Sequence, residues 1–282
     1  MMPARQDPVP SLTDRAALSR NRTRADRIGF VDFLHRIAAD EIQDRLREVN
    51  RSFTDIAVVT GHPKFWARAF PAARILADDP RIDLAPQSQD LVIHAMALHW
   101  AEDPVGQIAQ SARALRPDGL FIAACPGGRS LAELRDVMTR AEAEVSGGLS
   151  PRVLPMGEIR DLGGLLSRVG LALPVADQIG QRVSYRSLFH LAQDLRAMGE
   201  GNALAARLRR PTRRAVLMHA ARLYAQNHPD PQDSDRILAS FELVFLTGWA
   251  PDASQPKPLR PGSARMPLAD ALASMRQQND PT

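Results

Sequence analysis

DLVIHAMALHWAEDPVGQIAQSARALRPDG, residues 90–119, holds a complete unit of alternating secondary structure. Its apolar start, Asp90–Met96, predicts a buried strand. A proline opens the helix predicted over Pro104–Leu115, in the first turn where its missing N–H costs little. The turn residues Arg116–Gly119 end that helix, and GLFIAA at Gly119–Ala124 predicts the next strand. Strand, helix and strand in this order predict two parallel neighbours in one sheet.

The same alternation continues on both sides of this unit. Before it, an amphipathic helix is predicted over Arg24–Val49, and apolar runs predict strands at Asp55–Thr60 and Ala73–Ala77. After it, helices are predicted over Ser130–Val145, Met156–Val169, Leu188–Met198 and Thr212–Gln226, and strands over Pro174–Gln178, Gln181–Ser184 and Ile237–Thr247. Ser130 is the predicted N-cap of its helix, with Glu133 completing a capping box. The chain is therefore predicted to be an α/β protein, with a mostly parallel sheet, helices on both faces and an antiparallel edge.

Composition divides the chain into three parts and excludes several classes of protein. Residues 1–23 are predicted to be disordered or extended, 24–249 to form one domain that includes the N-terminal helix, and 250–282 to form a Pro-rich tail. No apolar run approaches the roughly 20 residues that span a bilayer, so no membrane span is expected. The single cysteine, Cys125, excludes an internal disulfide framework and a cysteine zinc site. We expect no metal site, and a reducing compartment, hence a cytoplasmic location.

The basic charge does not indicate a nucleic-acid-binding protein. Lysine and arginine number 36 against 32 acidic residues, and only Lys64 and Lys257 are lysines. The arginines are spread along the chain beside acids, whereas a nucleic-acid-binding protein usually concentrates them on one element. Their densest cluster lies within 207–214 and is either a solvated face or a surface that docks a protein.

Asp90–Gly119 resembles the fourth strand, the following loop and the helix of class I S-adenosylmethionine-dependent methyltransferases. Within that superfamily the chain is similar to the group that contains the methyltransferase-fold mitochondrial complex I assembly factor and its bacterial relatives, and more distantly to the carrier-protein methyltransferases of biotin synthesis. The segments that carry this likeness are DRLREVNRSF, SPRVLPMGEIRDLGGLLSRVGL, DLRAMGEGNAL and LTGWAPDASQPKPLRPGSA. The resemblance covers residues 13–268 and implies a Rossmann-like fold with S-adenosylmethionine as cofactor.

The cofactor motif implied by the resemblance is degenerate in this chain. The family's first strand ends in an acidic residue and a Gly-x-Gly-x-Gly loop, but here the segment reads AVVTGHPKF. Of the glycines Gly61 alone remains, and Val59 stands where the acid belongs. Asp78 falls on the family's adenine-contact acid. The segment before Ala73 is too short for the usual second strand, so the sheet is expected to lack it and to place Ala73–Ala77 directly beside Asp55–Thr60.

The resemblance implies a cofactor site at the carboxyl ends of the strands. Its contacts would come from Gly61 and Asp78, from Ala95 at the end of a strand, and from the following loop with His99 and Trp100. No catalytic residue can be assigned from the sequence. His94 and Cys125 are interpreted as packed core residues, because no partner that would activate either is evident nearby.

Three functional hypotheses remain open at this point. The first, implied by the resemblance, is methyl transfer. The second is a catalytically impaired pseudo-methyltransferase that binds a protein client, such as a respiratory complex I subunit, during assembly. The third is arginine hydroxylation of such a subunit. The lost acid, glycines and strand favour the second hypothesis. For a client, the segment Arg196–Arg214 together with the tail Pro251–Pro267 is predicted to form a docking lip over the crevice of the sheet.

Overall fold

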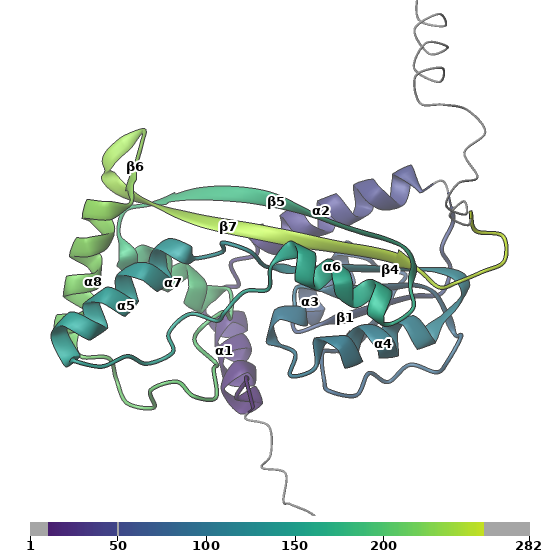
Figure 1. Cartoon of the computed structure of the whole chain (residues 1–282), viewed down its shortest axis with the longest axis horizontal. Helices are drawn as coiled ribbons and strands as arrows, with labels where there is room; N and C mark the ends of the chain where they lie inside the picture. Colours follow the sequence, from purple (N-terminus) through teal and green to yellow (C-terminus); the bar gives the residue numbers. More distant parts are fainter. Residues whose placement is uncertain (1–10, 50, 257–282) are drawn as a thin grey trace, which may run out of the picture. The chain divides into compact units, whose positions relative to one another are not determined.

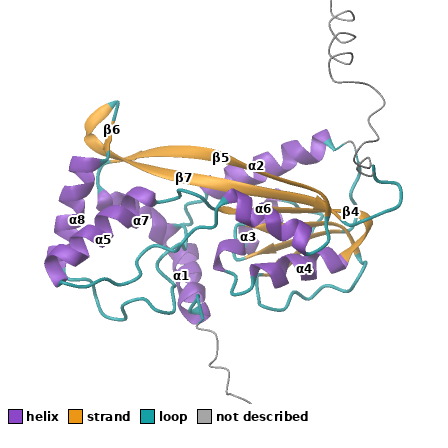
Figure 2. Cartoon of the chain, viewed as in Figure 1, coloured by secondary structure: helices purple, strands orange, loops and turns teal. Residues whose placement is uncertain are grey.

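The computed structural model describes residues 11–49 and 51–256. The chain divides into two compact units, Met1–Pro251 and Asp252–Thr282. Within the described part of the first unit one sheet runs in the order β2-β1-β3-β4-β7-β5, and β6 pairs with β7 (Figures 1 and 2). The strands are β1 (Ile56–Thr60), β2 (Arg74–Ala77), β3 (Gln89–Ala95), β4 (Leu115–Pro126), β5 (Ala172–Tyr185), β6 (Pro229–Asp230) and β7 (Asp233–Trp249).

The sheet has a parallel half and an antiparallel half. Strands β1 to β4 are mutually parallel, while β7 runs antiparallel to both β4 and β5. The α/β fold with a parallel-rich sheet and an antiparallel edge is confirmed. The two short strands predicted over 174–184 are one continuous strand, β5, because β7 pairs with it along its whole length.

Strand β2 lies directly beside β1. Val58 pairs with Ile75 and Thr60 with Ala77 in parallel register, so no strand of the described residues separates the two. The prediction that the chain lacks the usual intervening strand is thereby confirmed. As a consequence, the residue that follows β2, Asp78, sits close to the carboxyl end of β1.

Helices cover both faces of the sheet, as predicted. The helices are α1 (Arg15–Ile28), α2 (Phe33–Glu48), α3 (Pro63–Ala69), α4 (Pro104–Ala114), α5 (Ala132–Ser146), α6 (Ile159–Arg168), α7 (Leu188–Ala197) and α8 (Arg214–Asn227), with a 3₁₀ turn at Leu98–Trp100. Helices α2, α3, α5, α7 and α8 contribute to one buried core, which contains Val58, Ile93 and Phe245. Helices α4 and α6 contribute to the core on the opposite face, around Val92 and Phe121.

The N-terminal helix differs from the prediction. A single helix over Arg24–Val49 was expected, but the structure has α1 and α2, separated at Gly29, whose φ of 104° only glycine adopts without strain. The segment 1–23 is predicted to be disordered or extended, but residues 15–23 belong to α1 and are helical. Asp14 caps α1 by accepting a hydrogen bond from the N–H of Ala17. Residues 1–10, and most of the predicted tail, lie outside the described residues.

The predicted capping box at α5 is also wrong. The N-cap of α5 is Leu131, with a φ of 56°. The Ser130 hydroxyl instead donates to the carbonyl of Glu242 and accepts from its N–H. Glu133 accepts hydrogen bonds from the backbone N–H and the hydroxyl of Ser240. Both side chains therefore attach the start of α5 to β7 rather than cap the helix.

Candidate functional site

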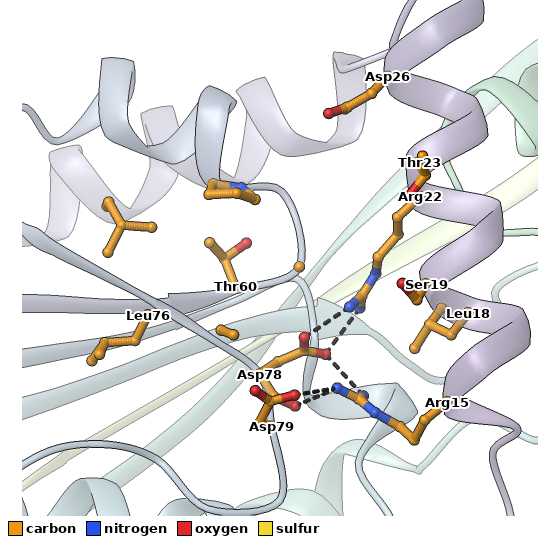
Figure 3. A pocket seen from close by; sticks show the side chains of 14 residues that line it. Arg15, Leu18, Ser19, Arg22, Thr23, Asp26, Thr60, Leu76, Asp78 and Asp79 are labelled. Carbon is orange, nitrogen blue, oxygen red and sulfur yellow. Dashed lines mark hydrogen bonds and ion pairs between the residues drawn. The ribbon is translucent and has the colours of Figure 1, made fainter.

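Helix α1 lies across the carboxyl ends of β1 and β2, where the sequence predicts the cofactor site (Figure 3). A cavity of about 340 Å³ separates them. Thr60, Gly61 and Asp78 line it from the side of the sheet. The helix contributes a row of polar side chains, which are Arg15, Ser19, Arg22, Thr23 and Asp26.

Two arginines of α1 hold the buried carboxylate of Asp78. Arg22 binds it through both terminal nitrogens, at 2.7 and 3.0 Å. Arg15 donates to the same carboxylate at 3.2 Å and to the Asp78 carbonyl at 2.8 Å. Burial of Asp78 raises its pKa, but the charge of Arg22 and the hydrogen bonds from both arginines lower it more, so that the pKa lies well below the ordinary value. Asp78 is therefore ionised and fully paired within the chain.

The guanidinium of Arg22 also covers Gly61. A Cβ atom added to Gly61 would overlap the guanidinium carbon of Arg22. An arginine of the same chain thus lies against this glycine, in the space that the resemblance assigns to the cofactor.

Gly61→Ala should therefore displace the Arg22 guanidinium from Asp78. We expect the free energy of unfolding to fall by about 1–3 kcal/mol, as for a buried charged group that loses part of its hydrogen bonding. Urea denaturation measures this loss. Gly180→Ala is the matched control, since a Cβ there meets nothing within 4 Å. Equal stability of Gly61→Ala and the native chain would contradict this placement of Arg22.

S-adenosylmethionine does not fit this arrangement of the site. Asp78, the acid that the resemblance assigns to the cofactor, is already bound by Arg22 and Arg15. Gly61 is covered by the guanidinium of Arg22. Thr60, which ends β1, has no carboxylate to offer and instead accepts the N–H of His62 at 3.2 Å. No step of a reaction is therefore derived through this cofactor.

A second cluster forms around Glu200, in the loop after α7. Its carboxylate accepts the indole N–H of Trp100 at 2.7 Å and lies 3.1 Å from His99 Nε2. Burial raises the pKa of Glu200, but the larger opposing effect of His99, Arg22 and Trp100 lowers the pKa to about 2. Glu200 is consequently a carboxylate at neutral pH, although its side chain is only 18% exposed.

A second, largely apolar cavity of about 280 Å³ opens beside this cluster. His99, Trp100 and Glu200 form one wall. The remaining lining is mainly apolar and comes largely from α5 and α7, with single residues of other elements such as α2, α8 and β7; it includes Leu134, Met138, Leu188, Leu195 and Phe241. The cavity therefore combines an apolar interior with one charged carboxylate.

His62 lies between the cavity at Asp78 and the cluster around Glu200, in a buried group of aromatic rings. Its ring stacks on Phe30, with centroids 4.4 Å apart, and meets the edge of His35 at 4.8 Å. The Nδ1 of His35 accepts the indole N–H of Trp66 at 3.1 Å. Burial lowers the pKa of His62 to about 4; Glu200 opposes this effect and Arg22 adds to it. Both histidines are therefore neutral at pH 7.

These neutral histidines should make the fold sensitive to mild acid. An unfolded histidine gains a proton below about pH 6.5, whereas folded His62 gains one only near pH 4. The unfolded state thus binds more protons in this interval, and stability is lost as the pH falls from about 6.5 to 4, by about 3 kcal/mol for His62. Denaturant titrations from pH 7 to 4.5 measure the slope. His62→Phe should flatten it and the exposed-site control His190→Phe should not; equal slopes in all three proteins would contradict the assignment.

Helix α1 is fixed at both sides of its N-terminus. Glu102 accepts the N–H groups of Leu12 and Thr13 at 2.8 and 2.6 Å, and the N–H of Asp14 donates to the carbonyl of Ala203. Arg207 pairs with Asp14 at 2.8 Å and is only 15% exposed. Arg207, which the sequence placed in a docking cluster, is therefore a structural residue that holds α1.

The predicted site residues divide between the two cavities. Gly61 and Asp78 line the first, and His99 and Trp100 the second. Ala95 is fully buried at the end of β3 and lines neither of these two cavities. Their role as cofactor contacts stays a prediction.

Sequence reasoning missed three residues that define the site: Arg15, Arg22 and Glu200. The two arginines lie in a segment expected to be extended. The signal for Glu200 was available, since it is a lone acid between two glycines in the stretch RAMGEGN.

The remaining candidates are structural. His94 is fully buried, with Nε2 3.1 Å from the side-chain oxygen of Gln107. Burial raises the pKa of the Cys125 thiol to about 12, so it is not a reactive thiolate. In residues 11–49 and 51–256, no three His, Cys, Asp or Glu side chains are grouped so that they could hold a metal ion. Across the same residues no helix has the length and apolar character needed to cross a membrane.

Comparisons with known proteins agree with the strand pattern. Residues 46–123 match the family described as methyltransferase domain. The chain is 39% identical over 179 residues to the mitochondrial arginine-hydroxylase NDUFAF5 of Dictyostelium discoideum, covering 64% of this chain and 41% of the relative. It is 33% identical over 210 residues to NDUFAF5 of Danio rerio, covering 74% and 64%.

More distant similarities were also found. The chain is 32% identical over 199 residues to the malonyl-[acyl-carrier protein] O-methyltransferase of Laribacter hongkongensis, covering 71% of this chain and 63% of the relative. Among solved structures, the YcgJ protein of Bacillus subtilis aligns with a TM-score of 0.47 at 9% identity, covering 74% of this chain and 98% of that one. The chain thus covers less than two thirds of the length of these three curated relatives.

Proposed function

Because the chain belongs to the methyltransferase-domain superfamily, we propose that it uses this fold to bind a protein client, a subunit of respiratory complex I, at the apolar cavity beside His99, Trp100 and Glu200. In this role it is an assembly factor that does not depend on S-adenosylmethionine.

One observation carries the proposal: Arg22 and Arg15 both bind the carboxylate of Asp78, and Arg22 also covers Gly61. The chain's own guanidinium therefore takes the place of a nucleoside ligand. By contrast, none of the side chains that line the apolar cavity fills it as Arg22 fills the space beside Gly61. A ligand should therefore enter at the apolar cavity, next to the charged carboxylate.

The relatives support an arginine as the client group near this carboxylate. The NDUFAF5 proteins are named arginine hydroxylases. Glu200 is a charged, partly exposed carboxylate at the wall of the cavity, and carboxylates pair with guanidinium groups through strong, charge-assisted hydrogen bonds. His99 and Trp100 fix its orientation, so the carboxylate would meet a client arginine without rearrangement.

The test is a binding assay between the purified full chain and the complex I subunit homologous to the client of the assembly factors. Ala192→Trp should block the cavity, because Ala192 lines it and is exposed on α7. Ala109→Trp is the matched control, an exposed alanine on α4, which packs on the opposite face of the sheet. Binding by the native chain and the control, but not by Ala192→Trp, is expected. No binding by any of the three would refute the proposal.

Methyl transfer is the second candidate, favoured by the cavity of about 340 Å³ at the carboxyl ends of β1 and β2. It requires α1 to release Asp78. Isothermal titration with S-adenosylmethionine distinguishes the two candidates. We expect a dissociation constant weaker than about 1 mM, which corresponds to about 4 kcal/mol of binding free energy. Micromolar binding that is lost in Asp78→Ala would favour methyl transfer instead.

A further inference from the structure

The mouth of the apolar cavity carries unpaired positive charge. Arg196 lines the cavity and is exposed on α7. Arg152 also lines it, and the same residue lines a smaller cavity of about 180 Å³ together with Arg210 and Arg213. The two cavities therefore adjoin at Arg152, with Arg196 at one of them and Arg210 and Arg213 at the other. We call this surface, formed by Arg196, Arg210 and Arg213, the arginine rim.

Nearby carboxylates are already engaged and do not neutralise the arginine rim. Glu142 pairs with Arg152, which also donates to the hydroxyl of Thr212. Asp14 pairs with Arg207. Within the described residues no carboxylate lies within ion-pairing distance of the three arginines of the rim. An exposed surface with this surplus charge attracts acidic groups.

The size of the apolar cavity limits what can enter it. At about 280 Å³ it lies just below the range for ligand pockets, which begins at roughly 300 Å³. It therefore takes one or two apolar side chains rather than a large cofactor. Its apolar lining includes Leu134, Leu188 and Phe241, and burying such side chains against it is favourable because apolar surface is removed from water.

We propose that the cavity and the arginine rim together recognise an acidic amphipathic segment of a client protein, whose apolar side chains enter the cavity while flanking Asp and Glu residues pair with the rim. This inference rests on the proposed function and adds the chemistry of the client. A fatty acid fits less well, because its single carboxylate can meet only part of a rim that extends over α7 and the segment before α8.

The probe is a fluorescein-labelled peptide, SDEDLFDEES, titrated with the full chain and followed by fluorescence polarisation. Saturable binding is expected, weakened at higher salt because exposed charges are screened. Peptide SDEDSSDEES, without the apolar pair, and peptide SNQNLFNQQS, without the charges, should each bind at least about tenfold more weakly. Equal binding of all three peptides would overturn the proposal.

Variants locate the binding surface. Arg210→Glu/Arg213→Glu should weaken binding of SDEDLFDEES by about tenfold, since the variant removes two attractive exposed charges and adds two repulsive ones. Arg68→Glu/Arg81→Glu changes the net charge equally at exposed arginines elsewhere and should leave binding unchanged. Equal loss in both double variants, or displacement of the peptide by decanoate at equal concentration, would overturn the proposal.

The outcome separates this inference from the proposed function. If the complex I subunit binds but SDEDLFDEES does not, the client chemistry is wrong and the proposed function stands. If the peptide binds in the expected pattern and the subunit does not, the acidic-segment site stands and the proposed client is wrong.

Discussion

Replacing Arg22 by alanine should lower the free energy of unfolding by about 3 kcal/mol, the loss expected when one partner of a buried ion pair is removed. The Arg22 side chain is 11% exposed and that of Asp78 is 6% exposed. The variant loses both hydrogen bonds from Arg22 to the carboxylate, and only Arg15 remains, at 3.2 Å. Urea denaturation at pH 7 measures the effect.

Two controls separate this loss from a general effect of the substitution. In a double-mutant cycle, Arg22→Ala/Asp78→Ala should lose less than the sum of the single variants, because removing both charges leaves none buried alone. Arg36→Ala removes an exposed ion pair with Asp32 and should cost less than about 1 kcal/mol. Additive losses in the cycle would contradict the buried pair.

Replacing Glu200 by alanine should have the second largest effect, again about 2–3 kcal/mol, because the variant leaves two buried donors without an acceptor. These donors are the indole N–H of Trp100 and the ring of His99. Glu200→Gln keeps an acceptor of the same shape and should recover part of the loss. A Glu200→Gln variant as unstable as Glu200→Ala would show that charge, and not hydrogen bonding, dominates.

The charge of Glu200 adds a pH dependence with a defined sign. Its folded pKa of about 2 lies below the ordinary value of 4.5. The stabilisation it contributes is present above about pH 4.5 and is lost as the pH falls toward 2, by about 3 kcal/mol at most, less because the side chain is partly exposed. Acid titration of the native chain and of Glu200→Gln, compared below pH 4.5, measures this contribution; identical curves would rule it out.

The sheet could be predicted from the sequence because each strand is indicated by the residue pattern of its own short segment. Runs such as DIAVVT and GLFIAA are mainly apolar, and they lie in the interior of the sheet where both faces are covered. Even the adjacency of β1 and β2 followed from a count of residues, since the chain between them is too short for another strand.

Helix α1 could not be predicted in the same way because it is held by distant partners. Its sequence, RAALSRNRTRADRI, is mostly polar and buries only Ala17, Leu18 and Ala25. Its position depends on Glu102, Ala203 and Arg207, which lie far away along the chain. For this reason Gly61 and Asp78 could be found from their motif. Arg22, which binds Asp78 and covers Gly61, could not.

The placement of β7 between β4 and β5 sets the order in which the strands can pair while the protein is being synthesised. Synthesis runs from the N-terminus at roughly 5–20 residues per second, so β5 emerges well before the strand it pairs with. Until Asp233–Trp249 has been made, β5 has no neighbour in the sheet, and the edge of β4 stays open. Open apolar edges pair with other chains. Over this interval the unpaired edges of β4 and β5 are open to other chains, and β7, the last strand of the described residues, completes the sheet.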